Sequence, residues 1–144
     1  MYPFIKLALA ASALALTTTA HASELGERER GEFELCEVRE TNGDVILAEK
    51  YDITMRISGF GVTGYGGCNW YSAEFSRDAK RPLFDGIGGT ERACEDDRRQ
   101  DFEDRYFKML RHARTLTLNG QSLVVKSHKG NRWVFAVDCA DLGR

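Results

Sequence analysis

The alternation of apolar and polar residues predicts that most of this chain folds into short β-strands. Segment 32–40 ("EFELCEVRE") alternates apolar residues with acids and then shifts its phase by one position. Segment 45–57 holds further apolar residues at a spacing of two, which places their side chains on one face of a strand. We therefore expect one strand in 32–40 and one or two in 45–57. The apolar positions that define them are Phe33, Leu35, Val38, Ile53, Met55 and Ile57.

The middle and the end of the chain show the same period of two. In 69–75 ("NWYSAEF"), Tyr71, Ala73 and Phe75 fall on one face, and Trp70, Ser72 and Glu74 on the other. Asn-Gly between two alternating apolar runs is a strong hairpin signal, and a second turn separates the last run. We expect a closing three-stranded meander. Its landmarks are Leu116, Leu118, Asn119-Gly120, Leu123, Val125, Lys129-Gly130-Asn131, Trp133, Phe135 and Val137.

One segment, from about Glu95 to Ala113, has a helical period instead. Its apolar residues recur at spacings of three and four and so form one stripe. Acids gather near its start and bases near its end, which complements the helix dipole, and acid-before-base pairs at i,i+4 suggest ion pairs on the exposed face. The stripe consists of Phe102, Tyr106, Met109, Leu110 and Ala113.

These elements predict a mainly β fold of the α+β class. A small curved antiparallel sheet, or a partly closed β-barrel, with one α-helix packed on it would bury the apolar faces of the strands and the helix together. The glycine-dense segment 59–67 suits tight turns and close approach of neighbouring backbones.

The first 22 residues resemble a cleaved export signal. Lys6 is followed by an apolar run from Leu7 to Leu16 and by Ala20-His21-Ala22, a small-x-small cleavage site. We expect a charged flexible leader at 23–31 and one domain at 32–144. Position 23 is serine, so the acylated cysteine of a lipoprotein is absent, and no apolar run approaches the roughly 20 residues of a membrane span. The predicted location is the periplasm.

The net charge and the cysteine content indicate which partners are excluded and how the fold is cross-linked. The net charge is −2, and it becomes −3 without 1–22 because only Lys6 is removed, so the chain lacks the basic excess of a nucleic-acid-binding protein. Export takes the cysteines to an oxidising compartment, where two disulfides are the expectation. Four cysteines allow three pairings. We favour Cys68–Cys94 with Cys36–Cys139, because the second pair would tie the first strand to the last.

Two segments together resemble the META domain family, which includes HslJ-like heat-inducible envelope proteins. "GGCNWYSAEF" carries the Gly67-Cys68-Asn69 element, and "TERAC" from Thr90 to Cys94 carries the second. The resemblance extends roughly over 62–136, and Arg92 stands where the family usually has methionine. It implies a small barrel-like sheet with a helix, a role in the bacterial cell envelope that is often linked to stress, and no family-wide catalytic activity.

The chemistry-bearing residues favour architecture over catalysis. The closest cysteines are 26 positions apart, so no Cys-x-x-Cys redox motif exists, and neither a Gly-x-Ser-x-Gly elbow nor a P-loop occurs. His112 and His128 are read as solvated residues, and no metal site or cofactor is expected. In the main interpretation, Gly66 and Gly67 bend the chain so that Cys68 meets Cys94.

The alternative for the glycine-cysteine segment is a binding site. Small barrels often bind ligands at their mouths, and the candidate contact residues are Tyr65, Asn69, Trp70 and Tyr71. We expect a non-enzymatic periplasmic module that binds an envelope protein or a small ligand, or that protects against stress. The second hypothesis is a periplasmic inhibitor of a protease or lysozyme, with Arg77 to Leu83 as the inserted loop.

Overall fold

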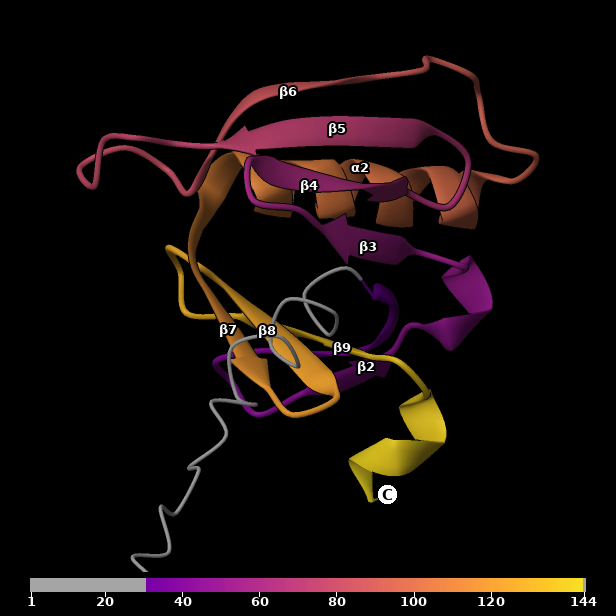
Figure 1. The fold of residues 1–144 in the computed structure, drawn as a ribbon. Coiled ribbons are helices and arrows are strands. Elements are labelled where there is room, and N and C mark those ends of the chain that lie inside the picture. Colours follow the sequence, from indigo (N-terminus) through magenta and orange to yellow (C-terminus); the bar gives the residue numbers. More distant parts are fainter. Residues whose placement is uncertain (1–30, 144) are drawn as a thin grey trace, which may run out of the picture.

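The computed structural model describes residues 31–143 (Figure 1). The predicted export signal and almost all of the predicted leader lie outside these residues. Within them the chain forms one nine-stranded antiparallel sheet and one α-helix, α2 (Asp97–His112), with two short 3-10 helices, η1 (Glu49–Tyr51) and η2 (Cys139–Leu142). The strands are β1 (Glu32–Arg39), β2 (Val45–Leu47), β3 (Thr54–Ile57), β4 (Gly61–Tyr65), β5 (Trp70–Phe75), β6 (Phe84–Gly89), β7 (Ala113–Asn119), β8 (Ser122–Ser127) and β9 (Arg132–Ala136).

The sheet curls toward closure but remains open. Its strand order is β6-β5-β4-β3-β1-β9-β8-β7, and β2 pairs only with β1. The two edge strands, β6 and β7, approach each other at one end, where the Leu83 amide just before β6 donates to the Ala113 carbonyl that begins β7, at 2.8 Å. The helix leads directly into β7 and contacts β6 and β8. The prediction of a curved sheet with one packed helix is confirmed.

The helix packs through the apolar stripe that the sequence predicts. Phe102, Tyr106, Met109 and Leu110 are all buried. The helix begins two residues later than expected, because the side chain of Asp96 caps it by accepting from the Arg99 amide at 2.9 Å. Burial of aromatic and aliphatic side chains between this helix and the sheet is the main source of stability in such a fold.

The helix also carries a buried aromatic cluster that joins distant parts of the sheet. The ring of Tyr106 lies 5.5 Å from that of Tyr71 on β5, 5.7 Å from that of Trp133 and 6.4 Å from that of Phe135, both on β9. Ring centroids at these separations are typical of favourable aromatic packing. One helical side chain therefore holds the two halves of the curled sheet together.

The phase shift in the first strand is a β-bulge. Between Leu35 and Glu37 the register of β1 against β9 shifts by one residue, so both Leu35 and Cys36 become buried. The extra residue at the bulge is Cys36, which bonds to Cys139 at the start of η2, just after β9. The irregular alternation in the sequence therefore marks the position of a disulfide.

Three local expectations were wrong or incomplete. Strand β6 was not predicted, because half of its residues are glycine and no apolar alternation is visible. Val137 lies beyond β9 and is exposed, whereas the strand itself is buried on both faces. The helix arginines do not pair with the acids four residues before them. Arg99 instead contacts Asp52, and Arg105 contacts Glu40, so both bind other elements of the fold.

Candidate functional site

The connection between β4 and β5 is a tight turn that only glycine can form here. Gly67 has a φ of +110°, a conformation that side chains with a Cβ rarely adopt. A Cβ on Gly66 would lie 3.0 Å from the Glu103 carboxylate, so a larger residue at this position would require that side chain to shift. The turn is closed by the Gly66 amide, which donates to the Asn69 carbonyl at 2.7 Å. This geometry confirms that the glycines direct Cys68 toward Cys94.

Both predicted disulfides are present. Cys68 bonds to Cys94, with Cα atoms 5.5 Å apart, and Cys36 bonds to Cys139, with Cα atoms 5.4 Å apart. The described cysteines are therefore all oxidised. The first bridge fastens the β4–β5 turn to the segment that leads into α2, and the second ties β1 to the end of the chain.

Asn69 joins the same two segments by hydrogen bonds. Its Oδ1 accepts from the Arg92 amide at 2.7 Å and from the Thr90 hydroxyl at 2.9 Å, while its Nδ2 donates to the Arg92 carbonyl at 2.9 Å. The side-chain amide thus pairs with both backbone groups of Arg92, as a neighbouring strand would. Because Asn69 is buried, these bonds make it a structural residue and leave it little capacity for a ligand.

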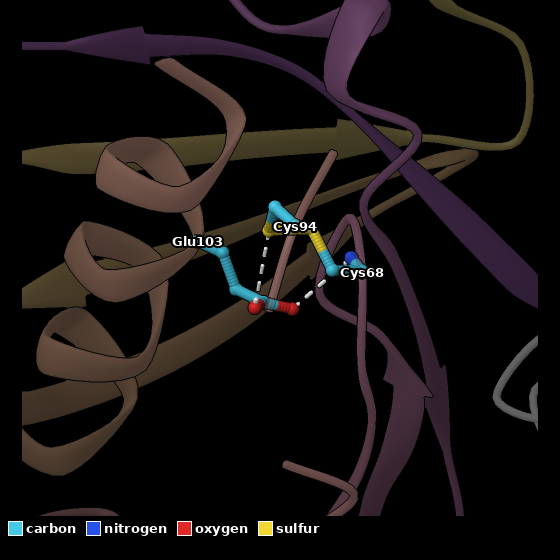
Figure 2. A group of neighbouring side chains, drawn as sticks. All are labelled: Cys68, Cys94 and Glu103. Atoms are coloured by element: carbon cyan, nitrogen blue, oxygen red, sulfur yellow. Dashed lines mark hydrogen bonds between the residues drawn. A yellow bond between two sulfur atoms is a disulfide. The ribbon is translucent and has the colours of Figure 1, made fainter. Parts of the chain in front are cut away.

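Glu103 completes this arrangement from the helix, and the sequence analysis did not identify it. Its side chain is only 2% exposed. One carboxylate oxygen accepts from the Cys68 amide at 3.1 Å (Figure 2) and from the Asn69 amide at 2.7 Å, and the other accepts from Asn69 Nδ2 at 2.8 Å. A buried carboxylate requires such compensation, because an unpaired charge in the interior is strongly unfavourable. Glu103 therefore holds the turn that carries Cys68.

The sulfur of Cys94 lies 3.7 Å from the second oxygen of Glu103 (Figure 2). A disulfide sulfur has no proton to donate, so we regard this as a packing contact. The ligand atoms of Cys68, Cys94 and Glu103 lie within 4.8 Å of one another, a spacing that could hold a metal ion if both sulfurs were thiolates. In the oxidised protein the two sulfurs are bonded to each other, and the group serves as a structural joint.

Arg99 fastens the helix start to the opposite side of the same turn. Its guanidinium donates to the Tyr51 and Gly67 carbonyls, each at 3.0 Å, and to the Lys50 carbonyl at 3.0 Å. It also contacts the carboxylate of Asp52 at 3.3 Å. The planar guanidinium of arginine, with its five N–H donors, suits donation to several carbonyl groups at once. The turn is therefore held from the helix by both Glu103 and Arg99.

The predicted contact residue Tyr71 is also structural. It donates its hydroxyl proton to the Thr54 carbonyl at 2.9 Å and lies 2.6 Å from the hydroxyl of Tyr106. Because Tyr71 has a single proton, Tyr106 is the donor in the second bond. Burial is the main cause that raises the pKa of Tyr71, and burial next to Tyr71 raises the pKa of Tyr106 well above its ordinary value.

The other two predicted contact residues lie at the surface. Trp70 is 61% exposed, and its ring lies 5.1 Å from that of the partly buried Tyr65. The four candidates thus divide into a buried structural pair, Asn69 and Tyr71, and a surface aromatic pair, the partly buried Tyr65 and the exposed Trp70. The surface pair begins and ends the β4–β5 turn, directly beside the Cys68–Cys94 bridge.

Two hollows flank the segment that leads from β6 to α2. One, of about 520 Å³, lies between β6 and α2 and is lined by Asn69 and Arg92. The other, of about 390 Å³, lies beside the disulfide and is lined by Tyr65, Arg92 and Arg99. Both are open and carry charges of both signs. Neither hollow is lined by Trp70 or Tyr71, so neither is the concave apolar pocket that a small-ligand site at these residues would need.

Comparison with known families identifies the family to which the chain belongs. The META domain model matches residues 24–139, so the chain belongs to the META domain family. The match confirms the resemblance seen in the sequence. A search of curated proteins found no match.

Solved structures with the same fold share little sequence with this chain. A protein from Burkholderia xenovorans determined by NMR is 19% identical, with a TM-score of 0.60 over 92% of this chain and 97% of that one. A crystallised duf4847 family protein from Bacteroides vulgatus is 12% identical, with a TM-score of 0.52 over 79% of this chain and 97% of that one. At these identities the likeness establishes the fold alone.

The structure adds one finding on membranes. Among the described residues, no helix is both long enough and apolar enough to cross a bilayer.

Proposed function

We propose that this META protein is an exported, non-enzymatic module of the periplasm that acts in binding or in protection against envelope stress. The predicted signal at 1–22 supports export, and the oxidised state of Cys36, Cys68, Cys94 and Cys139 fits an oxidising compartment. The polar groups at the glycine turn support a structural role for that turn, because Asn69 and Glu103 spend their hydrogen bonds within the fold.

The observation that carries the binding proposal is the surface aromatic pair of exposed Trp70 and partly buried Tyr65. Tryptophan and tyrosine are enriched among residues that dominate protein interfaces, because they bury a large area with few rotatable bonds. Here the pair is presented by a turn that a disulfide, Glu103 and Arg99 hold in place. A rigid platform reduces the ordering entropy that binding would otherwise require. We therefore assign the contact surface to Tyr65 and Trp70 and the partner class to an envelope protein.

The test compares two exposed aromatic residues. Phe60, on the turn before β4, is 86% exposed and provides a matched control for Trp70. Tagged wild-type protein should retain a specific envelope protein from periplasmic extract, identified by native mass spectrometry. Trp70→Ala should abolish retention, and Phe60→Ala should leave it unchanged. Equal retention by both variants, or no retained protein with the wild type, would contradict the proposal.

Export is tested separately. The protein recovered from a periplasmic fraction should begin at Ser23 by intact-mass measurement, because cleavage is expected after Ala22. It should contain no free thiol before reduction. A chain that retains residues 1–22, or that stays in the cytoplasmic fraction, would refute the assigned location without affecting the test of Trp70.

A second candidate function is inhibition of a protease or lysozyme. The loop between β5 and β6, residues 76–83, extends away from the sheet (Figure 1) and includes exposed Arg77 and Lys80. Asp78 stiffens it, since its side chain accepts from the Lys80 amide at 2.9 Å and its carbonyl from the Arg81 amide at 3.0 Å. An inhibitor should block a trypsin-like protease or lysozyme stoichiometrically, and Lys80→Ala should weaken that inhibition. A panel of such hydrolases that shows no inhibition would exclude this alternative.

A further inference from the structure

A separate hollow lies at the other end of the helix, between α2 and the turn that joins β8 to β9. Its volume is about 200 Å³. It shares no lining residue with the two hollows that flank the segment between β6 and α2. The helix contributes Arg105, Lys108, Met109 and His112, which share one helical face because they lie three, four and seven positions after the first.

The opposite wall is a turn with a fixed backbone. The Ser127 amide donates to the Asn131 carbonyl at 3.0 Å, and the His128 amide donates to the His112 carbonyl at the helix end, also at 3.0 Å. The rings of His112 and His128 lie 5.1 Å apart. The sequence reading of both histidines as exposed residues is confirmed, but it did not reveal that they stand side by side. The hollow is thus preformed by two elements that are bonded to each other.

The charge around this hollow has one sign. Five of its lining residues are basic, and none is acidic, whereas each of the other three hollows found in the described residues includes at least one carboxylate. Arg105 is neutralised by Glu40, so the surplus positive charge comes from Lys108 and Lys129. A concentration of bases in a protein of net charge −2 favours an anion. The basic residues are Arg105, Lys108, His112, His128 and Lys129.

The floor of the hollow is apolar. It is formed by Met109 and Trp133, which are almost completely buried, and the Arg105 guanidinium lies 5.9 Å from the centre of the tryptophan ring. Sites for drug-sized ligands usually enclose about 300 to 1,000 Å³. The smaller volume here suits a single ring or a short acyl chain.

Besides the basic walls and the apolar floor, Ser127 is a third feature of the hollow that favours a bound carboxylate. Its Oγ is buried, yet it has no hydrogen-bond partner in the part of the chain that the structure describes. Buried hydroxyl groups are nearly always paired, and one that lines a hollow can donate to a bound acceptor. Because this oxygen is closed off from solvent, a carboxylate in the hollow would satisfy it once the Ser127 side chain turns toward the hollow.

We propose that this hollow binds a small carboxylate with an apolar ring. The ring packs on Met109 and Trp133, and the carboxylate accepts from the Ser127 hydroxyl and meets the positive charges of Lys108 and Lys129. The charge of the walls selects an anion, the apolar floor selects a ring or chain over an inorganic ion, and the volume limits its size.

The first test uses four probes on the full-length oxidised protein. Benzoate, benzyl alcohol, acetate and inorganic phosphate are titrated by calorimetry and by chemical-shift changes of the Ser127, His128 and Trp133 signals. Benzoate should bind with a Kd of about 1 mM or tighter, at least about tenfold more tightly than neutral benzyl alcohol, and more weakly as salt rises. Benzyl alcohol that binds as well as benzoate would refute the charge assignment, and phosphate or acetate that binds as well would refute the apolar floor.

The second test uses variants. Lys108→Gln combined with Lys129→Gln should weaken benzoate about tenfold, while Lys126→Gln, an exposed lysine of β8 outside the hollow, should leave it unchanged. Ser127→Ala should weaken benzoate about fivefold without lowering the melting temperature, because the hydroxyl has no partner to lose. Unchanged affinity in the double lysine variant, or a Ser127→Ala protein that melts earlier yet binds benzoate normally, would overturn the proposal.

Trp70→Ala should have no effect on benzoate, because Trp70 is not among the residues that line this hollow. Failure of the Trp70 proposal and failure of the carboxylate proposal are therefore distinguishable. A benzoate response that is lost in Trp70→Ala would place the ligand elsewhere and would refute the assignment to the β8–β9 turn.

Discussion

Replacing Glu103 with alanine should destabilise the fold more than replacing any exposed acid of the same helix. The carboxylate accepts three hydrogen bonds, from the amides of Cys68 and Asn69 and from Asn69 Nδ2. Glu103→Ala leaves all three donors without this acceptor, and the donors belong to buried residues. No sequence motif pointed to this residue, so the prediction tests the tertiary arrangement directly.

The magnitude follows from the number of donors. Each unsatisfied buried donor costs about 1 to 3 kcal/mol. The hollows beside Asn69 and Cys68 are open enough for water to replace part of the lost bonding, which favours the lower figure for each donor. We expect Glu103→Ala to lower the free energy of unfolding by about 3 kcal/mol. Glu103→Gln should lower it by about 1 to 2 kcal/mol, because one carbonyl oxygen remains but its amide faces the donating Nδ2 of Asn69.

The assay is urea denaturation of the oxidised protein, followed by circular dichroism. Asp101→Ala, an exposed acid two positions earlier on α2, is the control and should change stability by no more than about 0.5 kcal/mol. The amides of Cys68 and Asn69 should also exchange hydrogen faster in Glu103→Ala, while those of β8 and β9 should follow global stability. A Glu103→Ala protein as stable as Asp101→Ala, with unchanged exchange at Cys68 and Asn69, would show that the carboxylate does not hold the turn.

The remaining predictions concern the bridges and the buried tyrosines. Cys68→Ser should lower the melting temperature more than Lys129→Ser. The loop-entropy treatment gives a stabilisation of about 3.5 kcal/mol for the 26-residue separation of Cys68–Cys94 and about 4.7 kcal/mol for the 103-residue separation of Cys36–Cys139. Cys36→Ser should therefore lower the melting temperature further than Cys68→Ser. Equal melting temperatures of Cys68→Ser and Lys129→Ser would contradict the prediction for the first bridge. Because burial raises the pKa of Tyr71 and Tyr106 above the ordinary value of 10.0, above that pH the unfolded chain loses protons that the native chain retains, and stability should fall as pH rises. Absorbance of tyrosinate at alkaline pH should therefore show these two tyrosines ionising only as circular dichroism reports unfolding, and their ionisation in folded protein would refute the assignment.

The strands with clear alternation and the helix stripe could be predicted because each reflects a local requirement. A strand that buries one face must alternate, and a helix that lies on a sheet must carry apolar residues every three or four positions. The phase shift before Val38 even marked the bulge at Cys36, although its cause became visible only with the pairing of β1 and β9. Strand β6 could not be found in this way, because Gly86, Gly88 and Gly89 have no side chains to alternate.

The candidate site was predicted less well, and the reason is again physical. The sequence offered four candidates that lie close together and that seemed equally suited to contact a partner: Tyr65, Asn69, Trp70 and Tyr71. Their roles differ because burial differs: the sheet turns Tyr71 inward and Trp70 outward. Glu103 shares the helical face of Tyr106 and Leu110, so its spacing was the one available signal that it would be buried.

The sequence by itself determined the class of fold and the family, since these depend on periodicity and on short motifs. It favoured one pairing of the cysteines, but only the structure decided among the three possible pairings, because the pairing depends on which segments are neighbours in space. Only the tertiary structure decided which polar groups face one another. Glu103 accepts from the Cys68 amide, and Ser127 and Lys129 line the same hollow as Lys108, across separations of the chain that no local pattern encodes. Hydrogen bonds and charges act through space. The groups that could bind a partner or a ligand are therefore brought together only where the sheet curls around the helix.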